Sequence, residues 1–386
     1  MRRLPGIREK KQEILPAGYL FDNRALKRLI APLIIEQILA VTVGMVDTMM
    51  VSSVGEAATS GVSLVDMINT LLINVFAAVA TGGAVVASQY LGQKNRKRAC
   101  ESAVQLLIVT GIISLLVMGV SILFQRGLLH LLYGNLEPDV MKNALVYLVI
   151  SAASYPFLAI YNSCAALFRS MGNSKISMQV SVVMNGINIF GDAVFIFGFH
   201  MGVAGAAFAS LISRMIACVI LMVRLFDPKL EITLKGTKFG WNQRIVGRIL
   251  QIGIPSGVEN SIFQLGRVIG VGFITMFGTT QIAANAVANN LDALGILPAQ
   301  AMNLALITVI GQCVGAGDYK QAEYYAKKLM KLTYLINGVC CMTVIATMPL
   351  TLKLYGLSAE TLVLAATLVL ILSLIHISEP TRPEPI

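Results

Sequence analysis

Hydrophobic residues in this chain of 386 residues fall into ten long runs separated by short polar segments. Most runs reach the roughly 20 apolar residues that a helix needs to cross a bilayer. The pattern therefore predicts an all-α, polytopic membrane protein. The expected helices cover 26–51, 64–91, 103–124, 144–168, 176–199, 203–226, 246–276, 282–314, 329–350 and 358–374.

The first hydrophobic run contains two acidic residues, Glu36 and Asp47. They are eleven residues apart, about three helical turns, so they share one helix face at a separation of roughly 16 Å. A charged group inside a membrane helix is costly and usually faces protein or water, which indicates a functional role. A structural ion pair is the alternative for either residue.

Composition supports a membrane protein and excludes several other classes. Hydrophobic residues make up 56 % of the chain and charged residues only 13 %, about half the charge of a soluble protein. The net charge of +10 comes from short loops, so it predicts membrane topology rather than a nucleic-acid partner. Six scattered cysteines, without CxxC or Cys/His spacing, indicate neither a disulfide framework nor a metal site.

The positions of lysine and arginine predict how the helices are oriented. Alternate loops on one side carry 24 of these residues, including Lys94, Arg96 and Lys97, whereas the loops on the other side carry 3. Basic loops tend to stay in the cytoplasm. We therefore expect a monomeric protein of the cytoplasmic (inner) membrane whose N-terminus is cytoplasmic.

The chain contains an internal repeat at an offset of 223 residues. Both halves start from the cytoplasm, so the repeat is parallel and predicts two pseudo-symmetric helical lobes with a substrate site between them near mid-membrane. The matching positions include Pro32 and Pro255, Glu36 and Glu259, Gln89 and Gln312, Gly92 and Gly315, and the polar pairs Asp66 with Asn289 and Asn69 with Asp292.

The repeat also predicts how the chain is divided. The expected segments are a basic N-terminal arm (1–24), an N-lobe of six helices (25–226), a cytoplasmic linker (227–245), a C-lobe with about four of an expected six helices (246–371) and a tail (372–386). The tail contains L-S-L-I-H-I-S-E-P-T-R and resembles a translated sequencing adaptor. We therefore expect a non-native tail on a truncated C-lobe.

Four short motifs carry a resemblance to a known family. They are Val46-Asp47-Thr48, Gln89-Tyr90-Leu91-Gly92, Asn188-Ile-Phe-Gly-Asp192 and Gly202-Val-Ala-Gly205-Ala-Ala-Phe-Ala-Ser210. In combination, over about residues 20 to 370, they resemble the multidrug and toxic compound extrusion (MATE) family. The resemblance implies two six-helix lobes, alternating access, and export of amphipathic organic cations in exchange for H⁺ or Na⁺.

The same resemblance implies a cation-coupling site at Asp47, Asn188, Asp192 and Ser210, the last being commonly threonine in relatives. Asn188 and Asp192 are four residues apart and share a helix face. Two carboxylates close together in a low-dielectric cavity cannot both ionise cheaply, which offers a proton site. Amide and hydroxyl oxygens equally suit Na⁺, so the coupling ion stays open and no other cofactor is expected.

Other polar residues within the hydrophobic runs are candidates for the cavity or its gates. Arg214 is expected to pair with a carboxylate such as Asp192 or to line the cavity, because an unpaired charge in the membrane is so unfavourable. Glu259 is near a cytoplasmic helix end, which favours an inner gate or an inter-lobe hydrogen bond. The complete set is Glu36, Glu259, Asp66, Asn69, Asn289, Asp292, Arg214 and Arg267.

Three classes of function fit a polytopic chain, and the sequence favours the first. These are a cation-coupled exporter, a lipid-linked saccharide flippase of the same fold superfamily, and an intramembrane enzyme. A flippase usually has a strongly basic cavity, whereas the deep charges here are mainly acidic. Walker A, HExxH and GxSxG sequences are absent, so neither an enzyme nor ATP-driven transport is indicated. The expected partners are small organic cations and the lipid bilayer.

Overall fold

The computed structural model describes residues 19–134, 136–275, 277, 279–354 and 359–378, and within these ranges helices are the only regular secondary structure. Eight of the described helices are long and apolar enough to span a bilayer, so the chain is a multi-pass membrane protein. The helices are α1 Asn23–Ser52, α2 Glu56–Gly92, α3 Arg96–Leu123, α4 Gln125–Tyr133, α5 Pro138–Ser170, α6 Ser174–Asp192, α7 Val203–Leu225, α8 Gln243–Thr275, α9 Thr279–Gly315, α10 Tyr319–Leu354 and α11 Ala359–Ser378.

All ten predicted helices are present, so the prediction of an all-α membrane protein is confirmed. Most are longer than predicted, because polar residues at their ends continue the helix beyond the apolar run. The sequence analysis missed α4, whose nine residues are too few to span a bilayer. It also missed a short π-helix, Ala193–Gly198, that continues α6. The predicted tail begins within α11, and residues 379–386 lie outside the described part.

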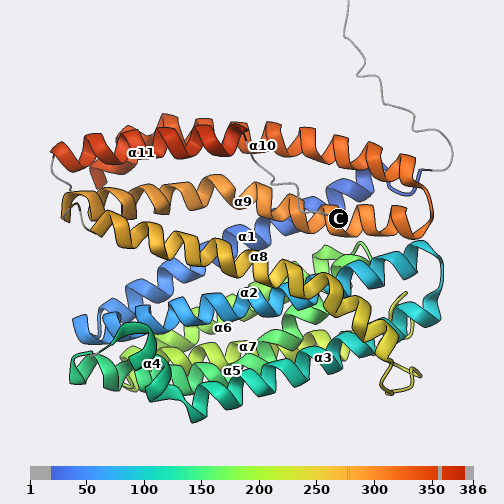
Figure 1. Cartoon of the computed structure of the whole chain (residues 1–386), viewed down its shortest axis with the longest axis horizontal. Helices are drawn as coiled ribbons and strands as arrows, with labels where there is room; N and C mark the ends of the chain where they lie inside the picture. The colour runs from blue at the N-terminus through green and yellow to red at the C-terminus, as the bar shows by residue number, and fades with distance from the viewer. Residues whose placement is uncertain (1–18, 135, 276, 278, 355–358, 379–386) are drawn as a thin grey trace, which may run out of the picture.

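The first helix of each repeat crosses from one lobe to the other. In Figure 1, α1 (blue) begins beside α10 and ends near α4, whereas α8 (yellow) begins near α3 and ends near α11. Accordingly α1 packs on both α6 and α9, and α8 packs on α2. The two helices run along opposite diagonals, as the internal repeat predicts for two pseudo-symmetric lobes.

The two lobes meet most closely where α2 crosses α9. A side chain at Gly92 would overlap the carbonyl oxygen of Gln312, and a side chain at Gly315 would overlap the carbonyl oxygen of Gln89. These four residues are two pairs related by the 223-residue offset, so the contact lies on the pseudo-twofold axis. It is near the end of the bundle that carries Lys94, Arg96 and Lys320, which we call the basic end.

Hydrogen bonds to α5 add to this contact at the basic end. The last carbonyl groups of a helix have no partner within it, and here side chains of α9 supply donors. Thr308 donates to the carbonyl of Arg169 at 3.1 Å, and Gln312 donates to the carbonyl of Ser170 at 2.7 Å. The end of α5 is therefore tied to the opposite lobe.

The segment that precedes α1 is bound to α10. The hydroxyl of Tyr325 donates to the carbonyl of Phe21 at 2.6 Å and accepts from its N–H at 3.1 Å. Both residues are buried, and Tyr19 packs edge-on against Tyr325. Residues 19–22 therefore hold the beginning of α1 against the C-terminal lobe.

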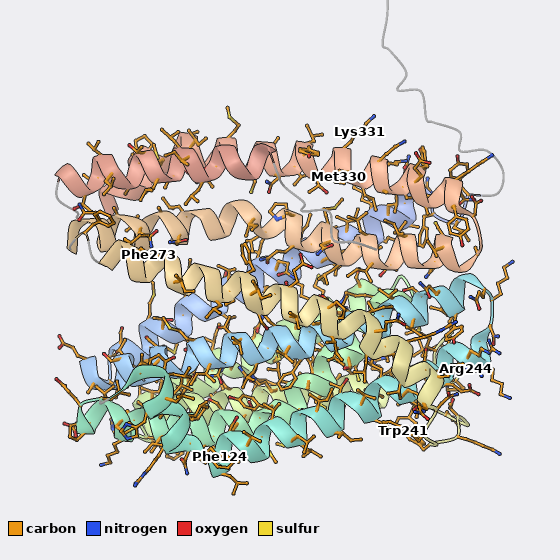
Figure 2. The ribbon with its side chains drawn as sticks, viewed as in Figure 1. Phe124, Trp241, Arg244, Phe273, Met330 and Lys331 are labelled. Atoms are coloured by element: carbon orange, nitrogen blue, oxygen red, sulfur yellow. The ribbon has the colours of Figure 1, made fainter. Side chains whose placement is uncertain are left out.

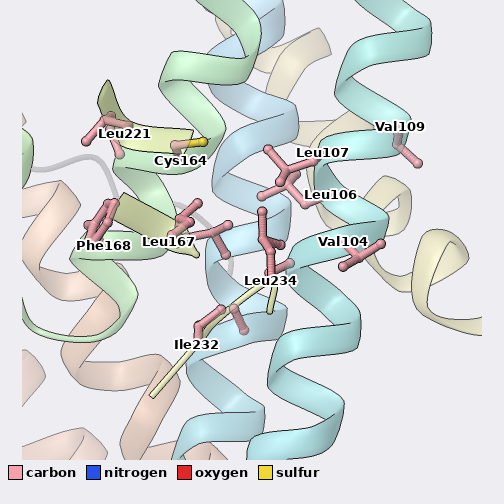
Figure 3. Close-up of a cluster of buried hydrophobic side chains, with 14 of the residues drawn as sticks. Val104, Leu106, Leu107, Val109, Cys164, Leu167, Phe168, Leu221, Ile232 and Leu234 are labelled. Carbon is pink, nitrogen blue, oxygen red and sulfur yellow. The ribbon is translucent and has the colours of Figure 1, made fainter. Parts of the chain in front are cut away.

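A corresponding contact holds the segment that precedes α8 against α3, the repeat partner of α10. Gln105 donates to the carbonyl of Gly240 and accepts from the N–H of Asn242 at 3.0 Å. Further back, Arg96 donates to three backbone carbonyls of the segment 228–231. Ile232 and Leu234 enter the hydrophobic core beside α3 and α5 (Figure 3).

Large apolar side chains cover much of the outer surface, as a lipid-facing protein requires. Phe124 and Phe273 are each 62 % exposed, and Phe124 points away from the bundle at its outer edge (Figure 2). Trp241 is exposed at the basic end, where Arg244 also lies (Figure 2). Tryptophan and basic residues together are typical of a membrane–water interface.

We predict that Gly92→Ala and Gly315→Ala both destabilise the protein, because the added methyl group meets a backbone carbonyl that cannot move away alone. Overpacking of this kind costs about 1–3 kcal/mol. Thermal unfolding in lipid nanodiscs measures the effect. Gly111→Ala is the matched control, because a methyl group at Gly111 meets open space. Equal midpoints for Gly92→Ala and the control would contradict the close contact.

We also predict that Tyr325→Phe loosens the segment before α1, because the N–H and carbonyl of Phe21 lose their partner. An unsatisfied buried group costs about 1–3 kcal/mol, so the amide of Phe21 should exchange its hydrogen at least several-fold faster. Hydrogen exchange measures this. Tyr324→Phe is the control, because the hydroxyl of Tyr324 accepts only a long bond of 3.3 Å from Lys328. Unchanged exchange in Tyr325→Phe would refute the role of this hydroxyl.

Candidate functional site

A cavity of about 540 Å³ lies among α1, α2, α5, α6 and α7. Its walls come from the end of α1 and the beginnings of α2 and α7, so it lies in the half of the bundle remote from the basic end. The size is in the usual range for a small-molecule site. Its charged and polar lining includes Asp47, Asp66, Tyr147, Asn188, Ser210 and Arg214.

Three of the four residues predicted to bind the coupling cation come together on one wall. The amide of Asn188 lies between Ser210 and Asp47, with 3.3 Å between Asn188 and the Ser210 hydroxyl. When its NH₂ group faces Asp47, as hydrogen bonding requires, it lies 3.1 and 3.3 Å from the two carboxylate oxygens. The wall thus combines groups from α6, α7 and α1.

The fourth residue, Asp192, lies behind this wall. Its side chain is 1 % exposed, and neither carboxylate oxygen accepts a hydrogen bond from a donor in the described residues. The carboxyl groups of Asp47 and Asp192 are within hydrogen-bonding reach of one another. A buried carboxylate without a donor is unstable unless a proton or a cation compensates its charge. Cation binding by Asp47, Asn188, Asp192 and Ser210 is a prediction, and these four residues are called the cation site below.

The local helix geometry fixes where Asp192 lies. The α-helical part of α6 ends at Asp192 and continues as the π-helix Ala193–Gly198, a form that often occurs at functional sites. Gly205 lets α7 approach the backbone of Phe195 in this π-helix, where a side chain would come within 3.0 Å. Close packing therefore holds α6 and α7 together beside the cation site.

A second acidic group, Asp66, lines the cavity from α2 and is exposed there. Asn69 donates to its Oδ1 at 3.2 Å, and the hydroxyl of Tyr155 donates to Asn69 at 2.8 Å. Asn69 and Tyr155 are buried. Tyr147 also forms a side-chain interaction with Asp66. The carboxylate is therefore held in place by a chain of polar groups that reaches into α5.

The one basic group on the described cavity wall is Arg214. It donates to the hydroxyl of the buried Ser154 at 2.7 Å. Among the described residues no carboxylate lies within 4.0 Å of the Arg214 guanidinium group. Its positive charge nevertheless interacts at longer range with the carboxyl groups of Asp47 and Asp66. The sequence predicted that Arg214 would either pair with an acid such as Asp192 or line the cavity. In the structure it lines the cavity.

Glu36 belongs to a different cluster on the same face of α1. Ser177 donates to its Oε2 at 2.8 Å, and Arg169 pairs with its Oε1 at 3.4 Å. Glu36 and Asp47 are eleven residues apart on α1, and their partners Ser177 and Asn188 are eleven apart on α6. The prediction that Glu36 and Asp47 share one helix face is therefore confirmed.

Of the candidates in the second half of the chain, the two whose side chains are described do not line the cavity. Glu259, the repeat partner of Glu36, is exposed on α8. Asn289 donates to the carbonyl of Asn285, one turn earlier in α9. The side chains of Arg267 and Asp292 lie outside the described part of the structure.

Sequence analysis missed several residues that shape the site. Ser154, Tyr155 and Tyr147 lie on α5 and support Arg214 and Asp66. A serine or tyrosine is common in membrane helices, so no sequence signal singled these residues out. The only available signal was the spacing of the two tyrosines: they are eight residues apart, which places them near one face of the helix and could have indicated a shared environment.

The model of the MatE family matches residues 32–194 and 255–379, which together are most of the chain. The two segments begin 223 residues apart, at the offset of the internal repeat. The matched segments include Asp47, Asn188 and Asp192 of the cation site.

Individual proteins agree with the family match. The uncharacterized transporter YisQ of Bacillus subtilis is 28 % identical over 356 residues, which are 91 % of this chain and 77 % of YisQ. The probable multidrug resistance protein NorM of Thermotoga maritima is 28 % identical over 304 residues, 77 % of this chain and 64 % of that relative. The chain therefore spans less than two thirds of NorM.

Solved structures share the fold. A crystal structure of MATE in the straight conformation has a TM-score of 0.85 at 21 % identity and covers 91 % of this chain and 79 % of its own. The structure of an outward-facing multidrug resistance MATE transporter of the MOP superfamily has a TM-score of 0.81 at 22 % identity. The match covers 92 % of this chain and 80 % of that transporter. The chain belongs to the MatE family, whose members are transporters and not enzymes.

Proposed function

We propose that this protein exports amphipathic organic cations across the cytoplasmic membrane in exchange for H⁺ or Na⁺. The relative named as a probable multidrug resistance protein supports drugs as the cargo. The cation site of Asp47, Asn188, Asp192 and Ser210 would bind the coupling ion. No other cofactor is needed for this exchange.

The observation that carries the proposal is the environment of Asp192. Its carboxyl group is buried next to a second carboxyl group, without a hydrogen-bond donor among the described residues. Structural acids are normally paired with a base or several donors. An acid that needs a mobile cation for its stability is suited to taking up and releasing that cation.

The chemistry of the site is compatible with either ion. Two adjacent carboxyl groups can share a proton, because both cannot ionise cheaply in a low-dielectric environment. The carboxylate, amide and hydroxyl oxygens of Asp47, Asn188 and Ser210 are hard ligands of the kind that small hard cations prefer. The experiment below separates the two ions.

Alternating access would couple the two movements, and the ion gradient would set their direction. With the basic end in the cytoplasm, the contact of Gly92 and Gly315 closes the inner side, and the cavity belongs to an outward-facing state. Ion binding at Asp47 and Asp192 would reposition α1 and the neighbouring helices and weaken cargo binding. The moving bodies we propose are the segments 25–226 and 246–371, joined by the linker 227–245.

A lipid-linked saccharide flippase is the less favoured alternative. The pyrophosphate of such a lipid is anionic and requires several basic groups. The described lining of the cavity contains the carboxylates of Asp47 and Asp66 and only the one guanidinium group of Arg214. This balance of charge favours a cationic cargo.

We predict that Asp47→Asn abolishes ion-driven export, because the amide cannot exchange a cation or a proton. The measurement is the uptake of a fluorescent organic cation into proteoliposomes, driven separately by a pH gradient and a Na⁺ gradient. The gradient that drives uptake by the unmodified protein identifies the coupling ion. Asp139→Asn, which neutralises an exposed acid outside the cavity, is the control. Full export by Asp47→Asn would refute the proposed site, and no response of the unmodified protein to either gradient would refute antiport.

We also predict that Asp192→Asn stabilises the protein while it abolishes coupling. The amide removes a buried charge and provides a donor to Asp47, which should add about 1–3 kcal/mol. Thermal unfolding in nanodiscs without Na⁺, compared with Asp139→Asn, tests this. A large loss of stability would show that Asp192 is instead a structural charge.

A further inference from the structure

Resting on the proposed function, we infer that Asp66 binds the cationic group of the cargo, at a position separate from the cation site. The cavity offers carboxyl groups with very different access. Asp192 is 1 % exposed and does not line the cavity. Asp47 is half-buried and engaged by Asn188, whereas Asp66 is exposed on the cavity wall. A bulky organic cation therefore reaches Asp66 most easily.

The position of Asp66 is fixed before any cargo arrives. Its Oδ1 accepts from Asn69, and Asn69 accepts from Tyr155, whose side chain is fully buried. The chain of two hydrogen bonds connects α2 to α5, which pack together along much of their length. A binding group that is held in place loses little conformational freedom when it binds a ligand.

The surroundings of Asp66 suit an amphipathic cation. Tyr147 interacts with Asp66 and also lines the cavity, so it offers an aromatic ring near the carboxylate. Val62, Ile73 and Met184 add apolar groups to the cavity lining. Methionine in particular adapts to ligands of different shape. An acidic group beside an aromatic ring and flexible apolar surface binds a charged, mostly apolar molecule without demanding one shape.

Arg214 limits how much positive charge the cavity accepts. Its guanidinium group is held by Ser154 and acts on both Asp47 and Asp66. Among the described residues of the cavity and the cation site, three carboxylates, of Asp47, Asp66 and Asp192, are opposed by one fixed positive charge. Once the cation site holds its ion, one net negative charge remains for the cargo. The cavity thus selects cations with a single charge, and ion binding weakens cargo binding through electrostatics even though the two do not share a site.

The test is equilibrium binding of ethidium, a fluorescent cation with one charge, to the purified full chain in nanodiscs. We expect Asp66→Asn to weaken binding about 10- to 100-fold, because a charge pair is lost. Glu56→Gln is the matched control, because it removes an exposed acid at the beginning of the same helix outside the cavity. Thermal unfolding establishes that each variant is folded.

Two further variants keep the inference falsifiable if Asp66→Asn does not fold. Tyr155→Phe leaves the charge of Asp66 intact and removes the support of Asn69, so binding should weaken about 3- to 10-fold, the effect of one hydrogen bond. Arg214→Gln should tighten binding of propidium, a relative of ethidium with two charges, about 10-fold more than that of ethidium. Unchanged affinity in Asp66→Asn, or in both substitute variants, overturns the inference.

The binding experiment is independent of the transport experiment, because it needs no ion gradient. Ethidium binding that depends on Asp66, without gradient-driven transport, would support the cargo position and refute antiport. Gradient-driven transport with ethidium binding that does not depend on Asp66 would leave the proposed function intact and refute the cargo position.

Discussion

The close contact of α2 with α9 is the constraint on which the rest of the structure depends. At Gly92 and Gly315 each helix lies against a backbone carbonyl of the other. Such an approach requires glycine, because a side chain of any size would separate the helices. The contact brings the two lobes to one axis at the basic end, whereas the cavity lies in the remote half of the N-lobe.

The parallel packing of α1 on α6 carries polar clusters at two levels of the membrane. Nearer the basic end, Glu36 is bound by Ser177 and Arg169. Eleven residues later, Asp47 faces Asn188 at the cavity. The same pair of helices thus connects the basic end with the cation site. A change in charge at Asp47 that bends α1 would act on the same helix that holds Glu36.

Sequence reasoning predicted the features that depend on periodic or repeated signals. The ten long helices follow from apolar runs, and the two lobes follow from matches such as Glu36 with Glu259. The grouping of Asp47 with Asn188, Asp192 and Ser210 was implied by family resemblance, and the structure brings these residues together. Their role as an ion site remains a prediction.

Other features could not be predicted, because they depend on contacts between distant segments. The π-helix after Asp192 has an ordinary apolar sequence, and its geometry is coupled to the close approach of Gly205. The support of Asp66 depends on the hydrogen bond from Tyr155 to Asn69, two residues that are 86 positions apart. The segment predicted as the linker also contributes to the core, where Ile232 and Leu234 are buried.

Because α1 crosses from the N-lobe to the C-lobe, the order in which the chain is synthesised affects when α1 finds its partners. The hydroxyl that binds Phe21 belongs to Tyr325, which is 304 residues later in the chain. At roughly 5–20 residues per second, the ribosome needs about 15–60 s to make that residue after Phe21. During this interval the beginning of α1 has no C-terminal partner. The N-lobe therefore reaches its final form only after much of the second repeat has entered the membrane.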